Sequence, residues 1–191
     1  MRINFSRLSA MAVLISAAGV MGAFATSASA DSITCEISGA IKLSPGLSET
    51  PTVQNIGITK HKGALLSNCS GSETPVTGGN VHVVTKTTEA VTCAALKGSG
   101  APVESANDAI FKWQPKGEST QNSTGSLSIP LTEMTVALEG TMNMGTFPFS
   151  EDKITGSVTQ KYSGTCGSSG HGKGGGKKVN KGKFTGTITI S

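Results

Sequence analysis

The chain has 191 residues, and the first 30 are predicted to be an export signal, which leaves enough chain for one domain with a real core. Beyond residue 30 it carries 14 lysines and no arginine against 12 acidic residues, with 25 glycines and 4% aromatic residues in the whole sequence. This composition excludes a highly charged disordered tail and collagen, and the scarcity of helix-forming runs excludes a helical bundle.

The N-terminal segment has the three parts of a secretory signal. Met1–Arg7 is positively charged, Leu8–Ala25 is uncharged, and Ala28-Ser29-Ala30 is a cleavage site of small residues. A membrane anchor is the competing interpretation, but serines and glycines dilute the apolar run, and Asp31 follows it in place of a basic cluster. We therefore expect cleavage after Ala30 and a secreted protein, either extracellular or associated with the cell envelope.

The first half of the remaining chain reads as short strands. Apolar residues occupy every second position over 33–43, which predicts a half-buried strand ended by Ser44-Pro45-Gly46. Val53, Ile56 and Ile58 suggest a second strand, and 63–69 suggests a third. The composition of Thr74–Gly79 is typical of a loop.

β-prone residues continue over 81–88, whereas 88–96 fits either a continued strand or a single helical turn. Residues 98–107 read as a loop. Ala109, Phe111 and Trp113 alternate, so we expect Trp113 in the core.

Four more alternating runs follow, at 127–131, 134–138, 154–162 and 184–190, and Pro130 indicates an edge strand or a strand end. Seven to nine short strands without a convincing helix predict an all-β fold, either a sandwich or a Greek-key barrel. We expect one domain over 31–191, with a Gly/Lys-rich loop at 167–183.

The four cysteines, Cys35, Cys69, Cys93 and Cys166, are expected to form two disulfides, because an even count in an exported protein favours pairing. Their wide spacing, without a C-x-x-C motif, argues against a metal site. Three pairings are open, and we prefer Cys35–Cys69 with Cys93–Cys166. In that pairing each cysteine lies in or just after a segment that reads as a strand, and the segments of the two bonded cysteines can be neighbours.

Several of these features together resemble a family of small secreted actinobacterial proteins. They are the cysteine before the first strand, Ser44-Pro45-Gly46-Leu47, the G-x-L-x-x-x-C run at 63–69, Phe111-Lys112-Trp113, Gly145-Thr146-Phe147 and Phe184-Thr185-Gly186. The resemblance covers nearly all of the chain beyond the signal, except the Gly/Lys segment at 170–182. It implies a secreted β-domain with two disulfides and supplies no activity.

Residues that could perform catalysis are sparse. The candidate bases His61, His82 and His171 have no G-x-S-x-G nucleophile motif to serve, and their surroundings are those of exposed histidines. A glycosidase is disfavoured, because the chain has one Trp and one Tyr to form sugar platforms. We expect no catalytic residues, no metal and no cofactor. An enzyme, if this is one, would have to use residues such as Glu139, His82 or Asp108.

The segment 171–183 is the one distinct charged feature, with Lys173, Lys177, Lys178, Lys181 and Lys183 and no acidic residue. It is a candidate anion-binding loop for an anionic polymer or a membrane surface, while a solvated turn is an equally good interpretation. Without arginine or aromatic residues it predicts no specific nucleic-acid binding.

We therefore expect a non-catalytic binding or interaction module at the cell envelope or in the medium. Its partner would be an anionic cell-envelope polymer or a surface protein. The alternatives are a secreted hydrolase with an unrecognised site, and an inhibitor or toxin-like protein, for which Thr74–Gly79 is the candidate loop.

Overall fold

The structure is a computed structural model that describes residues 32–58, 63–71, 76–97, 106–117, 119–144, 149–164 and 178–191, without the side chain of Asn107. The predicted signal peptide lies outside the described residues. Within them the chain forms nine strands and one short 3₁₀ helix: β1 (Ile33–Leu47), β2 (Asn55–Ile58), β3 (Ala64–Ser70), β4 (Val76–Lys86), η1 (Cys93–Lys97), β5 (Ala106–Pro115), β6 (Gln121–Ser128), β7 (Thr135–Met142), β8 (Lys153–Ser163) and β9 (Val179–Ile190).

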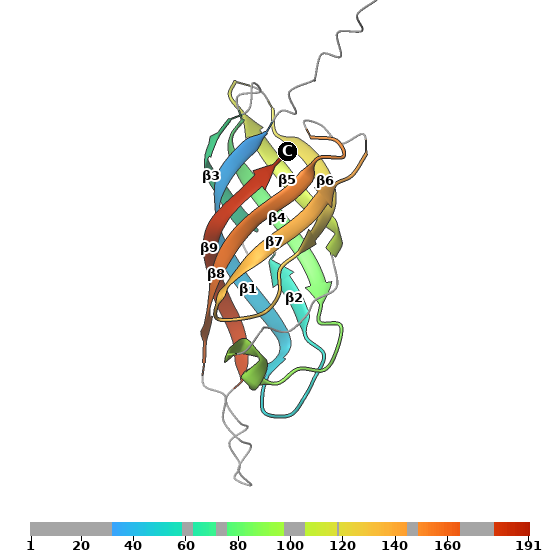
Figure 1. The fold of residues 1–191 in the computed structure, drawn as a ribbon, viewed down its shortest axis with the longest axis vertical. Helices are drawn as coiled ribbons and strands as arrows, with labels where there is room; N and C mark the ends of the chain where they lie inside the picture. The colour runs from blue at the N-terminus through green and yellow to red at the C-terminus, as the bar shows by residue number, and fades with distance from the viewer. Residues whose placement is uncertain are drawn as a thin grey trace, which may run out of the picture.

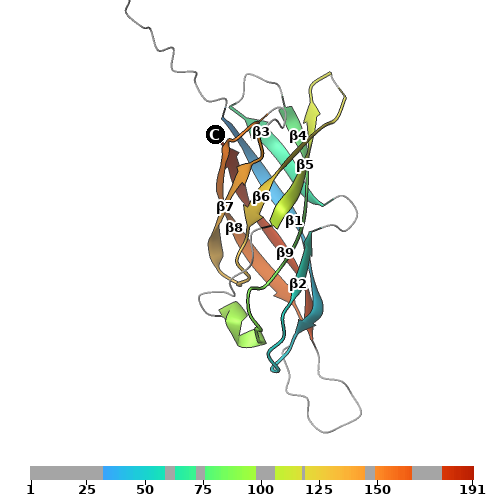
Figure 2. The ribbon, with the colours of Figure 1, turned by 90° about the vertical axis from the view of Figure 1, so that its right-hand side faces the viewer.

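Eight of the strands close into an antiparallel barrel. Strands β1, β3, β4, β5, β6, β7, β8 and β9 pair in this order, and β9 pairs back onto β1 from Ile33↔Ile190 to Leu47↔Val179. Figures 1 and 2 show the resulting elongated barrel with tilted strands. The prediction of an all-β fold with seven to nine strands is confirmed. The strands form a closed barrel and not a sandwich, but the barrel lacks the expected Greek-key connectivity. Its connectivity is up-and-down, because neighbours in the wall are neighbours along the chain.

The ninth strand, β2, completes the wall where β3 does not reach. Both β2 and β3 lie between β1 and β4 and run antiparallel to both. β2 pairs with the second half of β1 (Leu43↔Ile56), while β3 pairs with the first half (Ile37↔Leu66). The two strands therefore share one position in the wall.

The side chains of each strand alternate between the inside and the outside of the barrel, and those on the inside are mainly apolar. Ile37, Ile41 and Leu43 of β1 are buried, while the residues next to them in the chain are at least partly exposed. In the half nearer the C-terminus, Trp113 is fully buried, as predicted. Its ring stacks on Phe111 at 5.7 Å between centroids and meets the edge of Phe149 at 5.2 Å. The indole Nε1 donates a hydrogen bond to Ser123 Oγ at 3.0 Å, so its one polar atom is satisfied.

The prediction that β1 ends at Ser44-Pro45-Gly46 is wrong, because the strand runs through this segment to Leu47. The buried side chain of Gln54 replaces the missing strand partner there. Gly46 N–H donates to Gln54 Oε1 at 2.9 Å, and Gln54 Nε2 donates to Thr52 Oγ1 at 2.7 Å. Gly46 has a φ of +95°, a conformation that glycine adopts without strain.

Two expected loops are shorter than predicted. Strand β4 begins at Val76, so the second half of the predicted Thr74–Gly79 loop is strand. The strand requires glycine at positions 78 and 79, because an added Cβ would lie only 2.6 and 2.4 Å from the backbone of the neighbouring strands. Likewise β9 begins at Val179, so the last part of the predicted 167–183 loop belongs to the sheet.

The segment after β4 covers the end of the barrel away from the C-terminus (Figure 2). Of the two structures that 88–96 allowed, the helical turn is the one formed, as η1. Leu96 is buried beneath it, and its carbonyl accepts hydrogen bonds from Glu133 N–H at 2.8 Å and Thr132 Oγ1 at 3.2 Å. These hydrogen bonds fix η1 to the segment between β6 and β7.

The predicted Cys35–Cys69 disulfide is confirmed, and it joins the paired strands β1 and β3 with a Cα–Cα distance of 4.1 Å. Cys93 is disulfide-bonded as well. Cys166, the partner predicted for it, lies outside the described residues.

Candidate functional site

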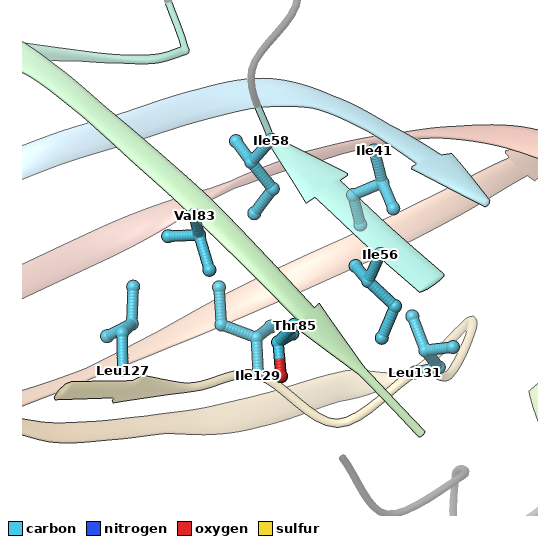
Figure 3. Close-up of a pocket in the computed structure, with 8 residues that line it drawn as sticks. All are labelled: Ile41, Ile56, Ile58, Val83, Thr85, Leu127, Ile129 and Leu131. Atoms are coloured by element: carbon cyan, nitrogen blue, oxygen red, sulfur yellow. The ribbon is translucent and has the colours of Figure 1, made fainter. Parts of the chain in front are cut away.

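The barrel interior is the first place to look for a ligand site, since an eight-stranded barrel can either be filled by side chains or hold one small ligand. A pocket lies inside the barrel between β1, β2, the second half of β4 and the end of β6, beyond the last β4–β5 pair, His82↔Ile110. Figure 3 shows the side chains that converge on it, which are aliphatic apart from one threonine: Ile41, Ile56, Ile58, Val83, Thr85, Leu127, Ile129 and Leu131. Its free volume of about 10 Å³ is room for no more than about one water molecule. We assign this pocket to the packed core.

Polar groups near this end of the interior serve structure. Gln160 is fully buried, and its Nε2 donates to the carbonyl of Pro130 at 2.6 Å. Tyr162 donates its hydroxyl proton to Gln160 Oε1. Burial, with a smaller contribution from Glu133, raises the pKa of Tyr162 well above its usual range. A phenol held neutral in this way ties β8 to the segment after β6 and does not act as a nucleophile or base at ordinary pH.

No hydrogen bond or ion pair joins the residues named as enzyme candidates. His82 on β4 lies between the inward-facing Val81 and Val83 and is half-buried, where an exposed histidine was expected. Asp108 on β5 and Glu139 on β7 are exposed, and β6 separates their strands. No group of three or more His, Cys, Asp or Glu side chains in the described part of the chain is arranged to hold a metal ion. His61 and His171 lie outside the described residues.

The predicted anion-binding lysines are only partly placed by the structure. Lys173 and Lys177 lie outside the described residues. Lys178 is exposed immediately before β9, while Lys181 and Lys183 project outward from β9 itself, on either side of the buried Gly182. Two of the five are therefore held in fixed register on the barrel wall.

Strand pairing brings two further lysines to the same place. Lys161 of β8 lies directly opposite Lys183, and Lys42 of β1 lies directly opposite Lys181. All four side chains are exposed on the outside of the barrel. Their strands, β8, β9 and β1, are adjacent in the wall, which Figure 1 shows as a ribbon. We call Lys42, Lys161, Lys181 and Lys183 the lysine face.

The rungs of the lysine face contain no acidic side chain. We call a rung the three residues that lie directly opposite one another on β8, β9 and β1. Ala40 completes the rung of Lys161 and Lys183, and Ser163 completes that of Lys181 and Lys42. The next rung consists of Thr159, Thr185 and Ser38. None of the four lysine side chains forms a hydrogen bond or ion pair with another described residue. Residues 153–191 contain seven lysines and no Asp or Glu, so the β8–β9 half of the face has no acidic residue in its own sequence.

An open hollow of about 500 Å³ lies beside three of these lysines, Lys42, Lys181 and Lys183, and is bordered also by Ala40, Ile41, Ser163 and Gly182. Cationic side chains around a hollow attract an anionic ligand, and small neighbours leave space for its uncharged parts. This is the strongest chemical feature of the described surface. Sequence reasoning found Lys181 and Lys183 by their local charge and missed Lys42 and Lys161, which join them only through long-range register.

No helix of the described residues is long and apolar enough to span a membrane. Comparisons with family models, curated proteins and solved structures found no match for the chain.

Proposed function

We propose that the protein is a secreted, non-catalytic binding module that attaches to an anionic polymer of the cell envelope through the outside of its barrel. The apolar packing of the described interior residues supports this most strongly, because the clustered charges of the described part of the chain lie on the outer wall. Export is supported by the A-x-A site at Ala28–Ala30 and by the Cys35–Cys69 disulfide, which suits an oxidising compartment.

Two other functions have less support. A hydrolase needs a nucleophile or acid–base pair within hydrogen-bond reach, and the exposed Asp108 and Glu139 lie on strands separated by β6. An inhibitor was expected to present a rigid loop at Thr74–Gly79, of which residues 76–79 are paired strand.

Co-sedimentation of the secreted protein with isolated bacterial cell walls tests this proposal. We expect the protein to pellet with the walls, to be released by added salt, and to liberate no soluble sugar or peptide fragments. Fragments in the supernatant would show a hydrolase. Failure to pellet at low salt would overturn the proposed attachment.

A further inference from the structure

We infer that the lysine face is the binding site, and that its ligand is a flexible polymer carrying phosphodiester groups at short intervals. This inference rests on the proposed function and names the surface and the ligand chemistry.

The geometry favours a ligand with several linked charges. Each rung of the face places two lysines on neighbouring strands, which lie about 4.8 Å apart, and successive rungs are about 6.7 Å apart along the strand. Like charges directly opposite each other in a sheet are destabilising. A chain with repeated negative groups can neutralise both pairs, Lys161–Lys183 and Lys42–Lys181, at once, whereas one small anion cannot.

The side chains present are those of a site that binds phosphate groups by charge alone. The lysine ammonium binds phosphate as a compact point charge, whereas arginine would add planar, two-pronged recognition of either phosphate or carboxylate. The chain has no arginine beyond Arg7, and the Trp and Tyr rings are withdrawn from the surface, with Trp113 fully buried and Tyr162 half-buried. The face therefore lacks the stacking groups typical of proteins that bind single-stranded nucleic acid.

The composition of the three strands of the lysine face argues against a membrane as the partner. Stable attachment to a lipid surface combines basic residues with apolar side chains that enter the bilayer. Leu65 of β3 lies opposite Ser38, and Val84 of β4 lies beyond Gly57 on the rung of Lys42, so exposed apolar residues border the face. The described parts of β1, β8 and β9 themselves carry no exposed large apolar side chain. Around the lysines themselves the outward residues are Ala, Ser and Thr.

The test compares two double variants of equal charge. K42Q/K161Q removes two members of the face that lie outside the predicted basic loop. K112Q/K153Q removes two exposed lysines elsewhere, one on β5 and one at the other end of β8. Binding of inorganic polyphosphate is measured by calorimetry over a series of salt concentrations, after thermal melting has shown that both variants are folded.

We expect K42Q/K161Q to weaken polyphosphate binding by about tenfold at low salt and to reduce the salt slope by about 1.4, since each phosphate contact contributes ~0.7. The control K112Q/K153Q should stay within about twofold of wild type. Equal losses in both variants would show non-specific attraction and overturn the site. Monomeric phosphate, poly-glutamate or anionic vesicles bound as tightly as polyphosphate would overturn the ligand assignment.

Wild-type protein that pellets with cell walls but does not bind polyphosphate would refute this inference alone. Protein that binds neither would refute the proposed function as well.

Discussion

Buried amides replace backbone partners at two places where the strand ladder is interrupted. Gln54 bonds the main chain at Gly46, and Gln160 bonds the carbonyl of Pro130, just beyond the end of β6. An unsatisfied buried polar group costs about 1–3 kcal/mol, so these side chains allow proline-containing segments to lie against the core. The Ser44-Pro45-Gly46-Leu47 motif is thus explained by its contact with Gln54.

Tyr162 provides a pH readout of this arrangement, because it is the one tyrosine of the chain. Its pKa is raised in the folded state, so the native protein keeps the proton at pH values where the unfolded chain loses it, above about 10. Stability is therefore unaffected by this group below pH ~10 and falls as the pH rises further. Ultraviolet absorbance should show almost no tyrosinate in the folded protein at about pH 11, and nearly complete ionisation in concentrated urea. A phenol that titrates at its ordinary pKa in the folded protein would contradict the burial of Tyr162.

At the scale of strands, the barrel depends on close approach between backbones. An added Cβ at Gly186 of β9 would lie 1.9 Å from the carbonyl oxygen of Ser157 on β8, and one at Gly156 would lie 2.2 Å from that of Thr187. These distances are far below van der Waals contact, so both positions require glycine. The high glycine content of the chain is in part a consequence of this curvature.

Gly186→Ala should therefore destabilise the barrel by about 3 kcal/mol, because the β8–β9 pair must separate to admit the methyl group. Gly117→Ala is the control. Its Cβ would meet nothing within 4 Å, so only its φ of +81° opposes the change, at about 1 kcal/mol. Urea denaturation measures both, and a loss at Gly186 no larger than that at Gly117 would show that the strands are not so close.

The sequence predicts strands well where alternation is uninterrupted, and poorly where glycine and proline fall inside them. The alternating residues of β1, β5 and β9 identified these strands, because each buries one face. Gly78, Gly79 and Pro45 were read as turn residues, although in this barrel they relieve crowding or bend a continuing strand. Two of the four residues of the lysine face were predicted from the sequence, and two were not. Lys181 and Lys183 form a local charge run, but Lys42 is brought beside them by the pairing of the first strand with the last, which no local pattern encodes.

In the whole molecule, the apolar core residues lie on the inner side of the barrel wall and the charged residues lie on its outer side. The described inward side is mostly apolar along the barrel, from Trp113 near one end to Leu131 near the other. On the outward side, β8 and β9 carry the exposed Lys153, Lys161, Lys181 and Lys183 and no acidic residue, because the 12 acidic residues of the chain all precede Lys153. If the proposed function is right, an anionic partner should approach β8, β9 and β1.

Mapping the contact surface by nitrogen–proton NMR during a titration with polyphosphate tests this account most directly. We predict that the largest shifts occur at the backbone amides of Lys42, Lys161, Lys181 and Lys183 and their neighbours, while the indole signal of Trp113 stays unchanged. Shifts centred on the residues that line the interior pocket, or on Leu65, Val84 and Ile110, would contradict it.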